Sequence, residues 1–540
     1  MLSKKKRLLS IVVTVILVAS ALSLTGCMEE DEDGEQEILL ETTLYVPDDE
    51  RADEMEVVQQ QVRDAGIDLE IEAVEWGTYI EEVEAGNAPL SYSGWSGPTS
   101  PEGSLNYMKK GNSWDWYSGW YENDEFTEKL DDAVSETDDQ ARWTLYHEAQ
   151  EILVDEDMGC FVMYTQRNPR AYHNSVDIPE ESWNSFMGAG PLVRANEWEV
   201  EGSDRIEVAQ THEPGDFHPI RYTDVYSGYV FLQMFEPLVS TYPDGEVNTN
   251  EYTVAESFDI SSDGLTMTFD IKDGIEFHNG DELNAHDVEF SINTMMMNEE
   301  DDEYFEMYDV DENPDSPREG DFGKVDSVEA TDDYTLEISM DEPDMELLQK
   351  EGIEYLNILP KNYIEENGWE VFEDELIGSG PYELEHYDPG DEILLTEFED
   401  YRNEVNTPEI RFDFYDEEST AVTALRSGDA HYMSRISPDN YYDLEDEDDV
   451  ETRSYPYMGH NRIAFNHNDG PFTDPDVRKA FAYAIDVDEI IAVSQGDELA
   501  DNTRSPIPSN HPAHNSDLNQ YERDVDQAIE LLEGAGYNGE

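Results

Sequence analysis

The stretch from Val254 to Met297 constrains the fold more than any other part of the chain. Apolar and polar residues alternate within it, which makes one face of a β-strand apolar at Leu265, Met267, Phe269 and Ile271. Asp-Gly or Asn-Gly dipeptides, which favour tight turns, lie at 263–264, 273–274 and 279–280. A helix is expected to begin at Asn284, because Asp287 follows three residues later in a capping-box position. The residues therefore predict a strand, a turn, a second strand and a helix.

Length and charge limit the class of protein. A chain of 540 residues is too long for one hydrophobic core and is expected to form at least two lobes. Its 30 Lys and Arg residues against 131 Asp and Glu residues give a net charge of −101, which repels nucleic acid and anionic membrane surfaces. The 31 Tyr, 19 Phe and 9 Trp residues predict packed cores rather than disorder. A carboxylate-coated surface suits molar salt, where screening removes most self-repulsion, so we hypothesise a halophilic archaeal source.

The first 27 residues have the pattern of an export signal. A basic segment, Lys4–Arg7, precedes the mostly apolar run 8–24, and Leu24-Thr25-Gly26-Cys27 matches a lipobox with Cys27 as the lipid attachment site. The alternative is an uncleaved membrane anchor. Residues 28–37 are acidic and predict a solvated tether. Cys160 would then be the one remaining cysteine, which excludes an intramolecular disulfide, and its apolar surroundings predict a buried small side chain.

A long motif points to a family. The stretch 255–291 resembles the signature of family 5 extracellular solute-binding proteins, the peptide- and nickel-binding components of ABC transporters. The matching residues are Ala255, Ser257, Ser262, Asp263, Gly264, Thr268, Phe269, Gly274, Phe277, His278, Gly280, Ala285, Asp287, Val288 and Ser291. The turn 378–382 and the segment 465–486 resemble later motifs of the same family, with Asp474 expected to cap a helix that starts at Pro475.

The order of the motifs differs from that family. Its signature lies near the N-terminus, whereas here it begins about halfway along the chain. The segment 38–76 predicts a β-α-β unit, and the resemblance makes Ile38–Glu199 the usual C-terminal part and the residues from Asp204 onward the usual N-terminal part. We interpret this as a circular permutation joined through Glu201-Gly202-Ser203. The competing explanations are a fusion of neighbouring genes and an exchange of halves between molecules.

The resemblance implies a fold and its division. The fold class is α/β, a two-lobed type II periplasmic-binding-protein-like fold with an extra small domain, circularly permuted. The expected parts are the signal peptide 1–27, the tether 28–37, the second part of lobe 2 at 38–165, lobe 1 at 166–239 with the seam near 200–204, the small domain at 240–350, lobe 1 continued at 351–458, and the first part of lobe 2 at 459–540.

Patterns of catalytic chemistry are missing from the sequence. It contains neither a phosphate-binding P-loop motif, nor G-x-S-x-G, nor H-E-x-x-H. Acidic pairs are too frequent for any of them to be nominated as an acid–base couple. His511 and His514 lie in a loop with Pro512 and are interpreted as exposed histidines rather than metal ligands. We therefore expect no enzyme activity, no cofactor and no metal.

A binding site needs aromatic walls and a few placed polar groups. The candidate ligand-binding residues come from the family's Gly-Trp loop, from its N-terminal contact loop and from the strand before Phe465. They are Trp95, Ser96, Tyr222, Asp224, Tyr226, Tyr457 and His460. In peptide-binding members of the family, an Asp three residues after the Trp receives the α-ammonium of the ligand. Pro98 stands at that position here.

The resemblance implies a lipid-anchored protein at the extracellular face of the cell membrane. It would act as a monomer that captures a small solute and delivers it to the membrane permease of an ABC transporter. Peptide, sugar, nickel chelate and other organic solutes all stay open as ligands. The alternatives from other classes are an exported hydrolase with an unrecognised acidic site and a lipid-tethered surface interaction protein.

Overall fold

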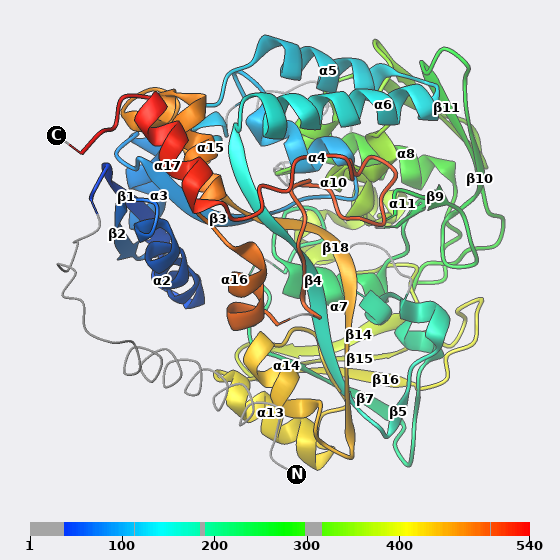
Figure 1. Ribbon diagram of the computed structural model, residues 1–540. Coiled ribbons are helices and arrows are strands. Elements are labelled where there is room, and N and C mark those ends of the chain that lie inside the picture. The colour runs from blue at the N-terminus through cyan, green and yellow to red at the C-terminus, as the bar shows by residue number, and fades with distance from the viewer. Residues whose placement is uncertain are drawn as a thin grey trace.

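The computed structural model describes residues 37–112, 114–183, 190–215, 217–242, 244–296, 316–496 and 498–539 (Figure 1). The predicted signal peptide, Cys27, nearly all of the predicted tether and Met297 lie outside these segments. Within them, every helix is too short or too polar to cross a membrane.

One mixed sheet of eleven strands runs through the molecule. In sheet order its strands are β14 (Tyr382–Asp388), β15 (Glu392–Glu397), β16 (Glu409–Phe414), β7 (Arg205–Gln210), β17 (Tyr432–Met433), β4 (Cys160–His173), β18 (Val450–Phe465), β3 (Leu90–Ser96), β1 (Leu40–Pro47) and β2 (Ile67–Val74), with β19 (Ala500–Asp501) paired to β4. Strand β1 is parallel to β2 and β3, and β7 is parallel to β16 and β17. The long central strands β4 and β18 are antiparallel to each other.

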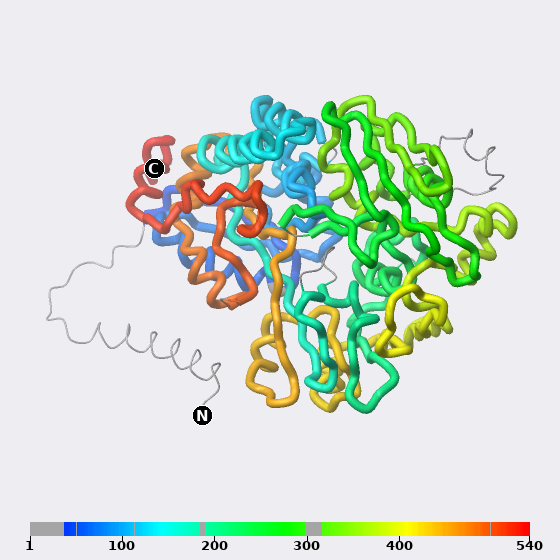
Figure 2. Tube along the Cα trace, turned by 90° about the vertical axis from the view of Figure 1, so that its right-hand side faces the viewer, coloured from blue at the N-terminus to red at the C-terminus, as the bar shows by residue number. Residues whose placement is uncertain are grey.

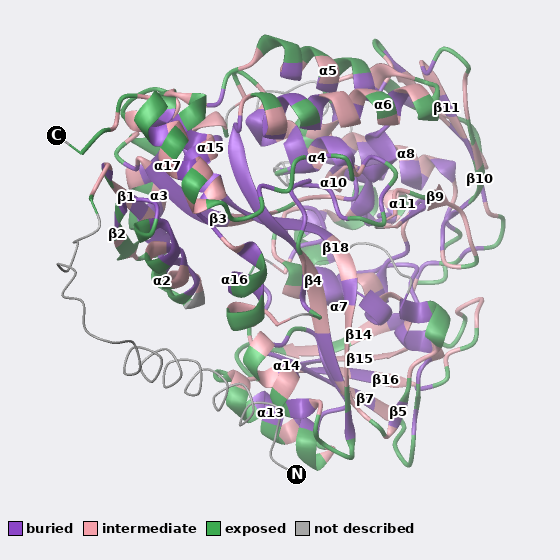
Figure 3. Cartoon of the chain, in the orientation of Figure 1, coloured by how far each residue is buried: buried purple, intermediate pink, exposed green. Residues whose placement is uncertain are grey.

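Two large hydrophobic cores lie at the two ends of this sheet. One core draws on residues 40–164 and 458–532, and we call the part around it lobe 2. The other draws on residues 176–432, and we call the part around it lobe 1. Figure 1 shows β4 and β18 running from the upper to the lower part of the molecule, and Figure 3 shows much of their length buried. The two-core organisation expected from the length is confirmed, whereas the individual domain boundaries stay a prediction.

Lobe 2 contains the predicted β-α-β unit. Helix α2 (Glu50–Arg63) connects β1 to β2, and their parallel pairing confirms the unit. Helix α15 (Pro475–Tyr483) begins as predicted, because the Asp474 side chain accepts from the backbone N–H of Asp476 (2.9 Å) and Pro475 is the first helical residue. The other helices of this lobe are α3 (Trp76–Glu84), α4 (Pro101–Leu105), α5 (Asp124–Ser135), α6 (Asp139–Gln150), α16 (Val487–Ser494) and α17 (Val525–Gly534).

Lobe 1 carries a smaller antiparallel sheet in the order β10 (Ala255–Ile260), β11 (Thr266–Ile271), β13 (Thr335–Met340) and β12 (Val325–Asp332). Its further short strands pair as β5 (Val176–Asp177) with β6 (Glu199–Val200) and β8 (Ser240–Thr241) with β9 (Val247–Asn248). Its helices are α7 (Val225–Met234), α8 (Ala285–Met295), α10 (Glu351–Glu354), α11 (Lys361–Asn367), α12 (Trp369–Glu375), α13 (Glu418–Ser427) and α14 (Pro438–Leu444).

The motif stretch folds largely as predicted. The alternating residues form β11, and α8 begins after a capping box in which the Asn284 backbone N–H donates to the Asp287 carboxylate (2.9 Å). The predicted second strand is wrong, because the residues after Gly274 form an isolated bridge between Glu276 and Glu282 instead. Strand β11 pairs with the preceding strand β10 and with the distant strand β13, so both of its edges are occupied by strands other than the predicted one.

The ends of the described chain lie side by side. Figures 1 and 2 both show α17 next to β1, and a Cβ atom on Gly539 would lie 2.3 Å from the Glu37 Oε1 atom. The turn formed by Glu201, Gly202 and Ser203 is exposed and follows β6.

Candidate ligand-binding site

Strands β4 and β18 separate at the centre of the large sheet. Their pairing runs from Val450–Pro456 and resumes at His460, so Tyr457, Met458 and Gly459 of β18 face Gln166 alone in β4. Such an excess of residues on one strand is a β-bulge, which interrupts the ladder and redirects side chains. The bulge lies at the edge of the lobe 2 core, which includes Met458, and β4 continues from there to Tyr172, which packs against the lobe 1 core. It therefore opens space at the junction of the two lobes.

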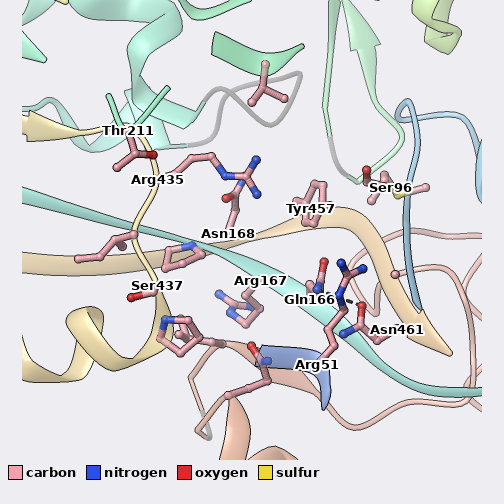
Figure 4. A pocket seen from close by; sticks show the side chains of 18 of the residues that line it. Arg51, Ser96, Gln166, Arg167, Asn168, Thr211, Arg435, Ser437, Tyr457 and Asn461 are labelled. Atoms are coloured by element: carbon pink, nitrogen blue, oxygen red, sulfur yellow. Dashed lines mark hydrogen bonds between the residues drawn. The ribbon is translucent and has the colours of Figure 1, made fainter. Parts of the chain in front are cut away.

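A cavity of about 1090 Å³ lies at this junction (Figure 4). Pockets for small organic molecules commonly enclose a few hundred to about 1,000 Å³. Both lobes and both crossing strands contribute to the wall, through residues within 51–57, 94–99, 166–169, 211–212, 223–229, 351–355, 416–418, 435–439, 457–461 and 490–499. The cavity is thus large enough for a small solute that contacts both lobes at once.

Three of the predicted ligand-binding residues line the cavity. Ser96 ends β3, Tyr226 lies in the first turn of α7, and Tyr457 belongs to the bulge of β18. Burial raises the pKa of Tyr457, and a hydrogen bond with the Ser96 side chain acts against this shift. The fold therefore brings together one predicted residue from lobe 1, one from lobe 2 and one from a crossing strand.

Trp95 and His460 support the wall from behind. The Trp95 indole donates to the Gly103 carbonyl (2.8 Å), and its ring lies 4.4 Å from the Tyr107 ring between centroids. His460 is fully buried, and its Nε2 atom is 2.9 Å from the Tyr107 hydroxyl. Burial and the nearby Arg462 guanidinium lower the pKa of His460 to about 3, so the ring is neutral. Neither residue is part of the cavity wall, and their ligand contact stays a prediction.

Tyr222 and Asp224 also have contacts within the framework. Tyr222 is buried, with the Arg318 guanidinium 5.0 Å from its ring centroid. Asp224 caps α7 by accepting from the Ser227 backbone N–H (2.9 Å) and hydroxyl (2.6 Å). Both lie outside the cavity wall, next to the wall residues Thr223 and Val225. Their role in ligand binding likewise stays a prediction.

Several charged residues of the cavity wall were not predicted from the sequence. Arg51, Glu54, Arg167, Glu354 and Arg435 all line the cavity. They lie on segments far apart in the chain, and acidic residues are too common for any one to stand out. The one sequence feature that could have pointed to the arginines among them is the rarity of arginine in this acidic chain.

Glu54 connects the elements of lobe 2 at the cavity wall. Its buried carboxylate accepts hydrogen bonds from the Tyr164 hydroxyl (2.9 Å), the Gln495 side-chain amide (2.8 Å) and the Tyr92 hydroxyl. These donors lie on β4, beyond α16 and on β3. Neutral donors thus hold a carboxylate at the cavity, because a buried polar group needs partners.

A second set of buried carboxylates joins the two lobes. Glu354 accepts from the Thr99 backbone N–H (3.1 Å) and hydroxyl on the lobe 2 side, and from the Thr241 hydroxyl (2.8 Å). Glu346 accepts from the Ser100 and Tyr146 hydroxyls, also of lobe 2. Burial is the main cause that raises the pKa of Glu354 to about 7. This contact therefore depends on the protonation state of one carboxyl group beside the cavity.

The histidine loop differs in part from its prediction. His511 is buried, its ring centroid lies 5.5 Å from that of Trp143, and its Nδ1 atom accepts from the Ala513 backbone N–H (3.0 Å). Its predicted exposure is therefore wrong, because Trp143 covers the loop. No group of three or more His, Cys, Asp or Glu residues suited to a metal ion occurs in the described segments. Cys160 is buried as predicted, and burial raises its pKa to about 12.

A solved structure confirms the class of fold. The ABC transporter substrate-binding protein CtaP from Listeria monocytogenes superposes with a TM-score of 0.53 and 25% identity, over 62% of this chain and 66% of that one. The fold is therefore that of a two-lobed, type II periplasmic-binding-like α/β protein. The family model for bacterial extracellular solute-binding proteins, family 5 (middle part), matches residues 22–116 and 251–540. The chain belongs to this family, which confirms the resemblance seen in the motif stretch.

Curated relatives bind different solutes. The Dipeptide-binding protein of Escherichia coli (strain K12) is 25% identical over 347 residues, which are 60% of this chain and 62% of the relative. Heme-binding protein A of Haemophilus influenzae is 25% identical over 307 residues, 53% of this chain and 54% of the relative. The chain thus spans between half and two thirds of the length of these relatives.

Protonation of Glu354 is predicted to stabilise the protein. Its pKa rises from an ordinary 4.5 in the unfolded chain to about 7 in the folded one, so the folded state binds the extra proton between these values. The stabilising contribution is full below the lower value and is lost as the pH rises through the upper one. The Tm of wild type minus that of Glu354→Gln should therefore increase as the pH falls from about 8 to about 5 at constant salt.

The exposed variant Glu365→Gln is the matched control, and its Tm should follow that of the wild type across the same range. Parallel curves for wild type and Glu354→Gln would contradict the prediction.

Proposed function

We propose that this protein captures a small organic solute, a peptide or a molecule of similar size, in the cavity between its lobes. It would then deliver the solute to the permease of an ABC transporter. The main observation that supports this proposal is the cavity of about 1090 Å³, whose walls come from both lobes and from the strands that join them. A solute that contacts both lobes stabilises the closed arrangement of the lobes. Because the closed form differs in shape from the open form, a permease can recognise the protein that carries a solute. Membership of the family supports the same role.

We propose attachment by a lipid at Cys27, on the extracellular face of the membrane, and action as a monomer. The lipobox pattern at 24–27 supports the anchor. Native mass spectrometry of the protein from its own host, purified in high salt, tests these points together. A monomer with a lipid-sized mass addition and a bound small molecule is the expected result.

Ligand binding is predicted to depend on the aromatic wall. Tyr457→Ala removes a ring from the bulge, so its affinity for the co-purifying solute should fall about tenfold or more, as for other buried aromatic contacts. Tyr334→Ala is the matched control, because Tyr334 lies in the turn between β12 and β13, outside the wall. Isothermal titration with the solute released from wild type measures both. Equal affinities for the two variants would count against the cavity, and release of altered solute would indicate hydrolysis instead of binding.

We further propose a circularly permuted order of segments relative to the family. The adjacency of Gly539 and Glu37 and the exposed turn at Glu201–Ser203 support it. A relinked variant, with 540 joined to 38 and the chain opened at Gly202, should therefore fold with the same circular dichroism spectrum and a Tm close to that of the wild type. Failure of this variant to fold would contradict the permutation. Two separate polypeptides in an intact-mass measurement from the native host would instead indicate two genes.

We also propose adaptation to molar salt, for which the net charge of −101 is the supporting observation. The Debye length is about 3 Å at 1 M salt and about 30 Å at 0.01 M, so dilution restores repulsion across the whole surface. The protein is therefore expected to unfold on dialysis into low salt, as followed by tryptophan fluorescence. A neutral osmolyte at matched osmolality should not replace the salt. A native spectrum at low ionic strength would overturn this proposal.

A further inference from the structure

Arg435 is an arginine at the cavity wall whose side chain has no carboxylate partner. It is exposed to the cavity, and its side chain makes neither a hydrogen bond nor an ion pair with any described residue. Among the lysines and arginines of the described segments, Arg63 shares this property, whereas nearly all the others form a hydrogen bond or an ion pair. Arg63 lies in the last turn of α2 and does not line the cavity.

The other two arginines of the wall are already engaged. Arg51 pairs with Asp49 at 2.5 Å. Arg167 lies 3.7 Å from the Asp501 carboxylate, and its Nε atom donates to the Ser454 hydroxyl (3.1 Å). Arg435 is therefore the one arginine of the wall that has neither a hydrogen bond nor an ion pair with the described residues. A cation without a carboxylate partner is unexpected in a chain where acidic residues outnumber basic ones by 131 to 30.

The backbone holds Arg435 firmly on both sides. Strand β17 ends two residues before it and pairs with β7 and β4, and Ser437, two residues after it, caps α14. The Ser437 backbone N–H donates to the Glu418 carboxylate (2.6 Å), so this nearby acid is tied to the backbone rather than to the guanidinium. Figure 4 shows the Arg435 side chain extending above Asn168 toward the side where Tyr457 lies. The guanidinium is thus presented to the cavity from a rigid support.

A guanidinium has five donors and no acceptor, and its planar fork matches the two oxygens of a carboxylate. Such charge-assisted pairs are stronger than neutral hydrogen bonds, and more so where water is partly excluded. The wall carboxylate of Glu54 is held by neutral donors of lobe 2 and that of Glu354 by threonines of both lobes, so neither is paired with Arg435. An anionic group of a bound solute would supply the missing partner.

We propose that Arg435 is the anion-recognition residue of this site and that the transported solute carries a carboxylate group which pairs with it. The inference rests on the proposed solute-binding function and adds the chemical class of the ligand. Arg435 thereby acts as a specificity-determining residue, because a solute without the carboxylate would leave the guanidinium desolvated and unpaired.

The test uses the small-molecule fraction released by denaturation from wild-type protein purified in molar salt. One half of the fraction is left untreated, and the other half is methyl-esterified, which converts each carboxylate to a neutral ester. Both halves are titrated into full-length wild type, Arg435→Gln, Arg435→Lys and the matched control Arg63→Gln. The unliganded Tm of Arg435→Gln should equal that of the wild type, because the replaced side chain has no partner in the described fold.

With the untreated fraction, Arg435→Gln should bind roughly 10- to 100-fold more weakly than the wild type, as expected for one lost hydrogen-bonded charge pair. Arg435→Lys should fall between them, since it keeps the charge and loses the fork, and Arg63→Gln should bind like the wild type. With the esterified fraction, wild type and Arg435→Gln should bind equally weakly.

Equal binding of both fractions by the wild type, or unchanged affinity in Arg435→Gln, would overturn the proposed role of Arg435 and leave solute binding intact. A wild-type protein that releases no small molecule and binds neither fraction would instead overturn the proposed function, and the inference with it.

Discussion

The antiparallel pairing of β4 with β18 is the interaction on which the rest of the structure depends. Buried residues of both strands belong to the lobe 2 core and to a smaller core formed with α13 and α14, and Tyr172 of β4 packs against the lobe 1 core. The two strands carry the covalent and hydrogen-bonded connection between the lobes. Had they paired without interruption, the sheet would be continuous and closed at its centre. The three-residue bulge at Tyr457–Gly459 breaks the ladder there, and the cavity lies at this break. The joint between the lobes and the place for a ligand thus have one structural origin.

The interior shows how a chain with few cations buries charge. Several of its buried carboxylates are satisfied by hydroxyl, amide and backbone donors: Glu54 by tyrosines and a glutamine, Glu346 by a serine and a tyrosine, and Glu354 by two threonines. Burial without a full ion pair raises the pKa of Glu346 and of Glu354.

Some buried arginines are likewise stabilised by neutral groups rather than by carboxylates. Arg462 donates to the Tyr117 carbonyl (2.9 Å) and lies against the rings of Tyr107 and Tyr117, with its guanidinium 4.5 and 4.4 Å from their centroids. Positive and negative groups are therefore stabilised separately in much of the interior. Against this background, a guanidinium at a cavity with neither a hydrogen bond nor an ion pair to any described residue is a feature of the site rather than a common property of the fold.

Local pattern by itself determined a large part of this protein. Alternation identified β11 and the β-α-β unit, side-chain chemistry identified the caps at Asn284 and Asp474, and the spacing of the motif residues identified the family. Each of these depends on residues close together in the chain, so its physical cause can be read without the rest of the molecule. The missing strand after Gly274 shows the limit, because the preceding strand β10 and the distant strand β13 occupy the two edges of β11.

Only the tertiary structure decided which side chains face the cavity. Tyr226 does and Asp224 does not, although they are two residues apart, because one is directed outward by the first turn of α7 and the other caps that turn. The wall joins residues from Arg51 to Leu499, and the burial of each one is set by neighbours hundreds of residues away. In a chain with so many acidic residues, negative charge alone marks no position as functional. Among the arginines of the wall, Arg435 is the one without a hydrogen-bond or ion-pair partner in the described segments, and this is a property of the folded molecule that has no counterpart in the sequence.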